Sequence, residues 1–134
     1  MEIIRAFSFF SERWYSESDH PSWRPRADIF ESGNQLIIRI EIAGMKADDF
    51  SITAVDGAKL VIAGVRPDPA CKSGFHLMEI PFGDFELTFN VPPGFVVDES
   101  RIRADYENGF LSVYCPRRRP SYRKITSTPG ETSQ

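Results

Sequence analysis

The feature that most restricts the fold is an alternation of apolar and polar side chains in the middle of the chain. In segment 35–42 every second residue is Leu or Ile, and Arg39 and Glu41 stand between them. A repeat of two residues is the repeat of a β-strand that buries one face. The segment therefore predicts a half-buried strand, whose inward positions are Leu36, Ile38, Ile40 and Ile42.

Similar short segments follow one another along the chain, and turn signals separate them. Asp56-Gly57 and Asn108-Gly109 each predict a tight hairpin, because these residue types tolerate the positive φ that such turns need. No helical repeat of about ten residues interrupts the series. The pattern predicts an all-β, two-sheet antiparallel sandwich. The expected strands cover residues 27–31, 35–42, 50–54, 59–65, 85–91, 101–106 and 110–115, with a further short strand at 75–80.

Three zones divide the chain. Residues 1–24 form an aromatic-rich N-terminal arm, residues 25–116 the sandwich, and residues 117–134 a flexible tail rich in Arg, Ser, Thr and Pro. Within the arm, four residues are spaced as on one face of an amphipathic helix, and prolines then close the segment. These four residues are Ile3, Phe7, Phe10 and Trp14.

Composition narrows the class of protein. Apolar residues make up 41% of the chain, which is enough for a sizeable core, and the formal charge of −3 gives no strong field. We therefore expect neither nucleic acid nor a membrane as a partner. The two cysteines are too few for a disulfide framework. Without a signal peptide or a long apolar run, a soluble, cytoplasmic protein is expected.

No catalytic or metal-binding pattern emerges. His20 and His76 are far apart and lack a second ligand at metal spacing. Acidic pairs such as Asp48-Asp49 and Asp98-Glu99 lie in turn-like contexts, where carboxylates are ordinarily solvated. Phosphate-binding glycine motifs are also missing. We therefore expect no enzyme activity, no metal and no cofactor.

A set of motifs in a fixed order carries a family resemblance. Segment 104–111, Ala-Asp-Tyr-Glu-Asn-Gly-Phe-Leu, resembles the A-x-x-x-N-G-x-L signature of small heat-shock proteins of the α-crystallin family. Segment 41–45 resembles the family's E-x-P-G element, with Ala43 in place of Pro, and segment 60–66 resembles L-x-I-x-G-x-R. The resemblance implies an immunoglobulin-like sandwich, the α-crystallin domain, that forms dimers or larger oligomers. It also implies an ATP-independent holdase that binds partially unfolded client proteins.

The resemblance also implies contact sites. An edge groove is expected between segments 50–55 and 110–114, and the alternation means that not all of its candidates can face the groove. Dimer contacts are expected between segment 75–77 of one copy and segment 28–30 of another. The tail carries half of the family's I-x-I/V motif, with Ile125 as anchor. The groove candidates are Ile52, Ala54, Leu111 and Val113, and the dimer candidates are Asp28, Ile29, Phe30, Phe75, His76 and Leu77.

The aromatic residues of the arm are candidates for contacts with clients or between subunits, because apolar side chains on a loosely tethered segment can cover exposed apolar surface. They would alternatively form a permanent oligomer core or an extra helix. A second function class stays open, that of a p23/CS-like co-chaperone or adaptor that binds one specific partner. The candidate residues are Phe7, Phe9, Phe10, Trp14 and Tyr15.

Overall fold

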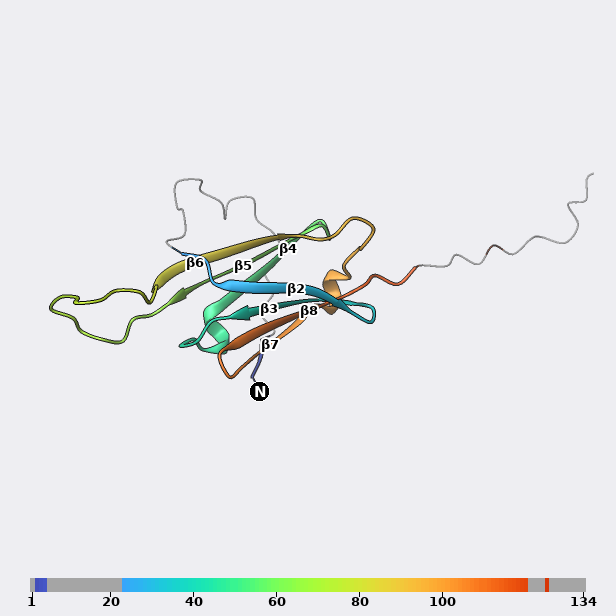
Figure 1. Ribbon diagram of the computed structural model, residues 1–134. Coiled ribbons are helices and arrows are strands. Elements are labelled where there is room, and N and C mark those ends of the chain that lie inside the picture. The colour runs from blue at the N-terminus through green and yellow to red at the C-terminus, as the bar shows by residue number, and fades with distance from the viewer. Residues whose placement is uncertain (1, 5–22, 121–124, 126–134) are drawn as a thin grey trace, which may run out of the picture.

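The computed structural model describes residues 2–4, 23–120 and 125 (Figure 1). Strands dominate these residues, and two short 3-10 helices connect some of them. The elements are β1 (Glu2–Ile4), β2 (Arg26–Ser32), β3 (Gln35–Glu41), η2 (Ala47–Asp49), β4 (Phe50–Val55), β5 (Lys59–Arg66), β6 (Gly83–Asn90), η3 (Glu99–Arg101), β7 (Arg103–Glu107) and β8 (Phe110–Pro116).

The strands form two sheets that face each other (Figure 1). One sheet has five strands in the order β1-β7-β8-β3-β2, and the other has three in the order β4-β5-β6. Within each sheet, neighbouring strands run antiparallel. The prediction of an all-β antiparallel sandwich is confirmed.

Side-chain alternation explains why β3 lies where it does. The predicted inward residues of segment 35–42 are all buried, whereas Arg39 and Glu41 are exposed. The same rule holds in β6, where Phe85, Leu87 and Phe89 are buried. Since each strand contributes every second residue to the space between the sheets, the two inner faces together make one apolar core.

Both predicted tight turns are present. Asn108 and Gly109 have φ values of 53° and 81°, and they form the two-residue loop that joins β7 to β8. Asp56 and Gly57 have φ values of 53° and 65°, and the turn between β4 and β5 is closed by a 3.0 Å hydrogen bond from Ala58 N to Val55 O. Positive φ at both central residues is the backbone twist that joins antiparallel strands.

Tyr106 supports the loop that follows β3. Its hydroxyl donates a 2.7 Å hydrogen bond to the carbonyl of Ile42 and accepts a 3.3 Å bond from the backbone N–H of Met45. Gly44, between these two residues, has a φ of 80°. The loop over the E-x-P-G-like segment is therefore held to β7, a strand distant in sequence.

Gly64 marks the closest approach of the chain to its own core. A Cβ atom at this position would lie 2.6 Å from the Asp49 carbonyl oxygen and 2.7 Å from Cζ of Phe85. The Phe85 ring in turn contacts the rings of Trp23 and Phe50, with centroids 5.5 and 6.2 Å away. The L-x-I-x-G-x-R-like segment therefore has a glycine where no side chain fits.

Three sequence expectations differ from the structure. Residues 75–80 form no strand, because within the described chain this loop lies beside no strand with which it could share backbone hydrogen bonds. Ile3 lies in β1 and not in a helix, since the segment pairs with β7. The other members of the predicted helical face lie outside the described residues. The strand predicted from Arg101 begins at Arg103, because Arg101 ends η3.

Candidate functional site

The outer edge of β2 is one of two surfaces that can contact another chain. Among the described residues, β2 pairs only with β3, so one side of its backbone has no strand neighbour. Asp28 and Ile29 are exposed, while Phe30 is half-buried with the Arg39 guanidinium 5.2 Å from its ring centroid. The predicted segment 28–30 therefore lies on an edge, where an added strand would find unpaired N–H and C=O groups.

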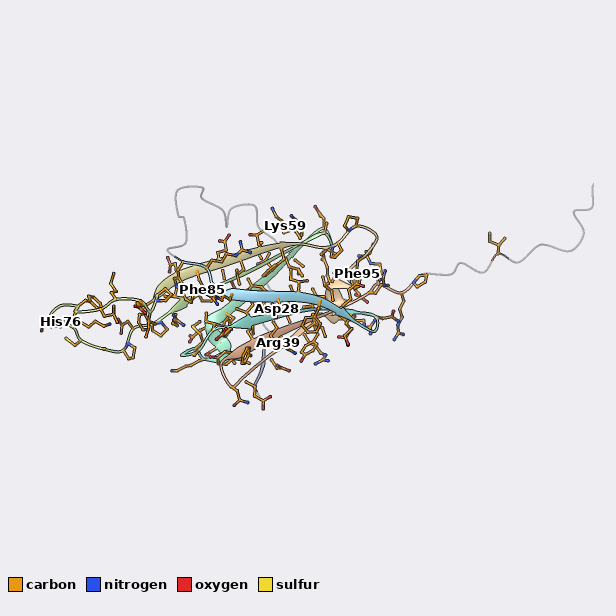
Figure 2. All side chains as sticks on the ribbon, in the orientation of Figure 1. Asp28, Arg39, Lys59, His76, Phe85 and Phe95 are labelled. Atoms are coloured by element: carbon orange, nitrogen blue, oxygen red, sulfur yellow. The ribbon has the colours of Figure 1, made fainter. Side chains whose placement is uncertain are left out.

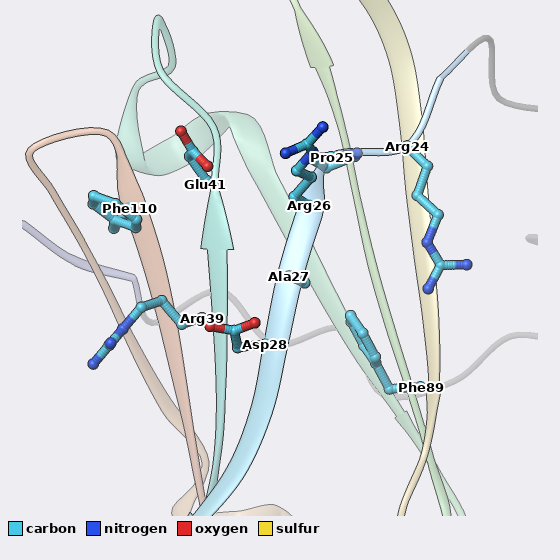
Figure 3. A pocket seen from close by; sticks show the side chains of 9 residues that line it. All are labelled: Arg24, Pro25, Arg26, Ala27, Asp28, Arg39, Glu41, Phe89 and Phe110. Carbon is cyan, nitrogen blue, oxygen red and sulfur yellow. The ribbon is translucent and has the colours of Figure 1, made fainter.

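A hollow of about 580 Å³ accompanies this edge (Figure 3). Figure 3 shows β2 crossing it, with Phe89 of β6 on one side and Arg39 of β3 on the other. Its charged lining is of mixed sign. The charged residues are Arg24, Arg26, Arg39, Asp28 and Glu41. Mixed charge of this kind suits an extended polypeptide better than a polyanion, which would need a predominantly basic surface.

The second surface is the loop between β5 and β6, which extends from one end of the sandwich (Figure 1). Four large apolar side chains on it are more than half exposed. They are Phe75 (56%), Leu77 (75%), Met78 (69%) and Ile80 (66%). Such a group on one loop is unusual for a surface that stays in water, and it is typical of an interaction site.

The base of this loop is held by Arg66. Its guanidinium donates to the Pro81 carbonyl from both Nε, at 2.9 Å, and Nη2. Nη1 donates to the carbonyl of Ala43 at 3.4 Å. The same group lies 4.3 Å from the ring centroid of Trp23, and the Trp23 indole N–H donates to Gly83 O at 3.1 Å. The Arg66 side chain thus connects the two ends of the loop to Trp23, three residues before β2.

The segments predicted to meet in a dimer are separate within one chain. Figure 2 shows His76 at the tip of the loop and Asp28 on β2, far from each other. Phe75, His76 and Leu77 are exposed. Contact between segments 75–77 and 28–30 therefore requires two copies of the chain, and this pairing stays a prediction.

The predicted groove residues are corrected by the structure. Ile52, Ala54, Leu111 and Val113 are all buried members of the core. The reason is the sheet order: β8 is an inner strand between β7 and β3, so it borders no groove with β4. The alternation predicted that not all four residues could face the groove, and in the structure all four belong to the core.

In the five-stranded sheet, β7 lies on the side nearest to β4. The short strand β1 pairs with the outer edge of β7. Glu2 lies opposite Tyr106, Ile3 opposite Asp105, and Ile4 opposite Ala104. β1 also lies next to η2, which leads into β4. On the other side of the sandwich, Trp23 bridges to Phe85 of β6 close to the start of β2. The backbone edge of β7 is thus occupied by the chain's own N-terminal residues.

The tail anchor and the aromatic residues of the arm complete the set of predicted site residues. Ile125 is 89% exposed. Phe7, Phe9, Phe10, Trp14 and Tyr15 lie outside the described residues, as does His20. Leu87 is fully buried in β6.

The polar side chains of the described residues lie mostly at the surface. Their buried polar side chains are only Thr53 and Ser112. Burial raises the pKa of the Cys115 thiol to about 12, so this thiol is protonated at neutral pH. Cys71 is exposed. Across residues 23–120, His, Cys, Asp and Glu do not gather in threes as a metal site would need. Within the same part, every helix is too short or too polar to cross a bilayer.

Sequence reasoning missed two features of these surfaces. It assigned no role to Arg66, although the residue ends the L-x-I-x-G-x-R-like segment. The sequence did indicate a loop at Pro67, Pro69 and Gly74. However, a short strand was expected at 75–80, and Met78 and Ile80 were not recognised as exposed apolar residues.

Comparison with other proteins agrees with this arrangement. The chain is 27% identical over 115 residues to small heat shock protein C2 of Rickettsia felis, covering 82% of this chain and 73% of the relative. It is 29% identical over 97 residues to heat shock protein 16 of Schizosaccharomyces pombe, covering 69% and 66%.

Solved structures show the same fold. A small heat-shock protein from Xylella fastidiosa matches with a TM-score of 0.67 and 26% identity, covering 81% of this chain and 98% of that one. HspA from Xanthomonas axonopodis matches with a TM-score of 0.65 and 27% identity, covering 72% and 96%. Residues 28–127 match the sequence model of the Hsp20/alpha crystallin family. The chain therefore belongs to the Hsp20/alpha crystallin family, whose members are the small heat-shock chaperones.

Proposed function

We propose that this protein is an ATP-independent holdase of the cytoplasm, which binds partially unfolded proteins and prevents their aggregation. The observation that carries the proposal is the match of residues 28–127 to the small heat-shock family, and the exposed apolar group on the β5–β6 loop supports the assembly of copies that this function uses. Family membership favours this function over a p23/CS-like adaptor. Exposed apolar side chains bind apolar surface without any chemical step, so nucleotide hydrolysis is not needed.

The loop supports dimerisation as the first step of assembly. The proposed contact places segment 75–77 of one copy against the β2 edge of another, where segment 28–30 offers unpaired backbone groups. Phe75 and Leu77 would then leave water together. Two-fold symmetry would form the contact twice, which is the commonest arrangement in soluble dimers. Burial of the loop residues would explain their exposure in a single chain.

The arm is proposed to supply client contacts. A buried aromatic side chain of about 150–250 Å² gains roughly 4–6 kcal/mol at about 25 cal/mol per Å². Ordering each arm residue costs about 1–2 kcal/mol for the backbone alone. Each contact is therefore weak, and several arms in one oligomer bind through avidity. This suits clients that share no sequence.

Client aggregation tests the proposal directly. Full-length protein is heated with an aggregating client in nucleotide-free buffer, and light scattering is followed. We expect suppression by the wild-type chain and its loss when Phe7, Phe9, Phe10, Trp14 and Tyr15 are all replaced by Ser. Replacement of four polar arm residues by Ala is the matched control, since it leaves the aromatic residues in place. Unchanged suppression by the Ser variant would contradict the role of the arm.

Dimerisation is tested separately by native mass. The Phe75→Asp/Leu77→Asp variant should sediment as a monomer, because it places two carboxylates in the proposed contact. Ser73→Asp/Gly74→Asp adds the same two charges to the same loop outside segment 75–77, and this control should keep the wild-type mass. A double variant that keeps the wild-type mass would contradict the proposed contact.

A further inference from the structure

The outer face of the five-stranded sheet is a third surface with the features of a contact site. Along β2, β3, β8 and β7, every second residue packs toward the core, so the residues between them point outward. The strand registers align these outward residues in rows across the sheet. The first row is Arg26, Glu41, Phe110 and Glu107; the second is Asp28, Arg39, Ser112 and Asp105; the third is Phe30, Ile37, Tyr114 and Arg103.

Ser112 lies in a hollow near the centre of this face. The hollow has a volume of about 370 Å³, and Phe110 and Tyr114, two residues to either side along β8, also line it. Ser112 is only 9% exposed although it points away from the core, whereas Phe110 is 43% exposed. The face therefore has an exposed aromatic ring next to a cavity whose floor is a small side chain.

Charged side chains of alternating sign lie beside this hollow. Along β2 the order is Arg26 and then Asp28, and along β3 it is Arg39 and then Glu41, each pair two residues apart on the same face (Figure 3). Across the two strands, Arg26 is opposite Glu41 and Asp28 is opposite Arg39. Among the described residues, neither carboxylate has an ion-pair partner in its own chain. The two rows thus carry opposite sequences of charge.

This charge pattern is complementary to itself. Consider a second copy that faces the first, related by a two-fold axis that crosses the strands between the first and second rows. Arg26 of one copy then faces Asp28 of the other, and Arg39 of one copy faces Glu41 of the other. Because the relation is two-fold, each of these pairs forms twice. Opposite charges that meet across a contact fix its register and disfavour other arrangements.

The same axis also matches the shapes of the two faces. It places the Phe110 ring of each copy over the Ser112 hollow of the other, so that two rings leave water together. An axis parallel to the strands would instead bring Asp28 against Asp105, two carboxylates. The axis between the rows has one unfavourable pair, Asp105 against Glu107, at the β7 rim of the contact. Charge and shape therefore select one arrangement.

We propose that the outer face of the five-stranded sheet joins two copies of this chain, with the Phe110 ring of each copy in the Ser112 hollow of the other. Four strands about 4.8 Å apart, over about six residues at about 3.4 Å each, give roughly 400 Å² per copy, which is the size of a weak contact. The proposed loop contact uses the backbone edge of β2, whereas this one uses outward side chains. The two contacts can therefore coexist, and neither needs a client.

Exchange of the two charges on β3 tests the contact. Sedimentation of the full chain is followed over a concentration series. Arg39→Glu and Glu41→Arg should each raise the concentration at which copies associate through this face by at least about 10-fold, because each change brings like charges together twice. The double variant Arg39→Glu/Glu41→Arg should restore the wild-type value. Lys59→Glu, on the exposed start of β5, makes the same charge change on the other sheet and should have no effect.

The double variant separates contact between copies from contact within one chain. Within a chain, position 39 is opposite Asp28 and position 41 is opposite Arg26. The double variant therefore keeps both like-charged neighbours that the single variants create inside each chain. Its association recovers only if the exchanged charges meet in another copy.

Glu107→Lys is a second test, in which association increases. It replaces the unfavourable pair at the rim by a Lys that faces Asp105 of the other copy, again twice. We expect association at an about 3- to 10-fold lower concentration, a gain that misfolding does not mimic. Asp48→Lys, on the exposed surface of η2, is the matched control and should keep the wild-type value.

Each failure has a defined meaning. A double variant that associates no better than the single variants overturns the contact, and so does equal association of Glu107→Lys and Asp48→Lys. A wild-type mass that does not change with concentration also overturns it. The charge pattern should persist in the Phe75→Asp/Leu77→Asp chain, and its loss there would overturn a contact separate from the loop. Failure of client suppression with the charge pattern intact would remove the holdase proposal and leave this contact in place.

Discussion

Gly64→Ala tests the tightest contact in the core. The added methyl group would lie 2.6 Å from the Asp49 carbonyl oxygen and 2.7 Å from Cζ of Phe85, so the backbone of η2 or the Phe85 ring must move. Gly64 lies opposite Phe50 in β4 and Phe85 in β6, and both phenylalanines are buried. Overpacking of this kind costs about 1–3 kcal/mol.

Gly74→Ala is the matched control. A Cβ at Gly74 meets nothing within 4 Å, and this glycine has no positive φ. Replacement of a glycine by alanine also stabilises by about 0.4–1 kcal/mol through the unfolded chain, where the backbone conformation allows it. Both variants receive this contribution, and only Gly64→Ala receives the steric cost. The difference between them therefore isolates the contact.

Thermal unfolding at one fixed protein concentration is the assay, because association shifts the midpoint. Each kcal/mol corresponds to about 4–8 °C for a domain of roughly this size. We expect Gly64→Ala to melt at least about 4 °C below Gly74→Ala. Tryptophan emission should also change, since the Phe85 and Trp23 rings are in tilted contact, with centroids 5.5 Å apart. Equal midpoints for the two variants would refute the packing argument.

Three further predictions concern single side chains. Tyr106→Phe should lower the free energy of unfolding by about 1–2 kcal/mol in urea, because it removes the bonds to Ile42 and Met45; no change would show that water replaces them. Arg66→Lys should leave the midpoint nearly unchanged but speed chymotrypsin cleavage within the β5–β6 loop, because the guanidinium contacts at its base are lost; equal cleavage rates would contradict the clamp. The contribution of Cys115 to stability should be constant below the ordinary thiol pKa of 9.0 and fall toward pH 12, because the unfolded chain ionises this thiol first; a Cys115→Ala chain should lose this part of the pH dependence, and identical alkaline profiles for the two chains would contradict the argument.

Much of the fold was predictable because strand patterning is local. In each alternating segment, the apolar positions indicate which residues face inward. The Asn108-Gly109 and Asp56-Gly57 turns then determine how neighbouring strands connect. The pattern at Leu36 to Ile42 was sufficient to name a buried face correctly. Such rules act over a few residues, and they need no knowledge of the rest of the chain.

The edges were not predictable, because they depend on which strands are neighbours. Leu111 and Val113 were assigned to a groove, but the sheet order places β8 between two other strands. β1 was not predicted, for a similar reason: its partner, β7, is about a hundred residues away in the sequence. The spacing of Ile3, Phe7 and Phe10 is also compatible with one face of a helix. Met78 and Ile80 were missed because an apolar run without a pairing partner still resembles a strand.

Trp23 lies next to the base of the β5–β6 loop. This residue is where the N-terminal segment joins the sandwich, and it stacks on the same guanidinium that closes the base of the β5–β6 loop. Two segments rich in apolar side chains are thus rooted at one corner. In the proposed assembly, the loop that joins two copies and the arm that binds clients would start at the same corner. An unfolding protein released by one arm would then find another nearby, and rebinding would be faster than escape.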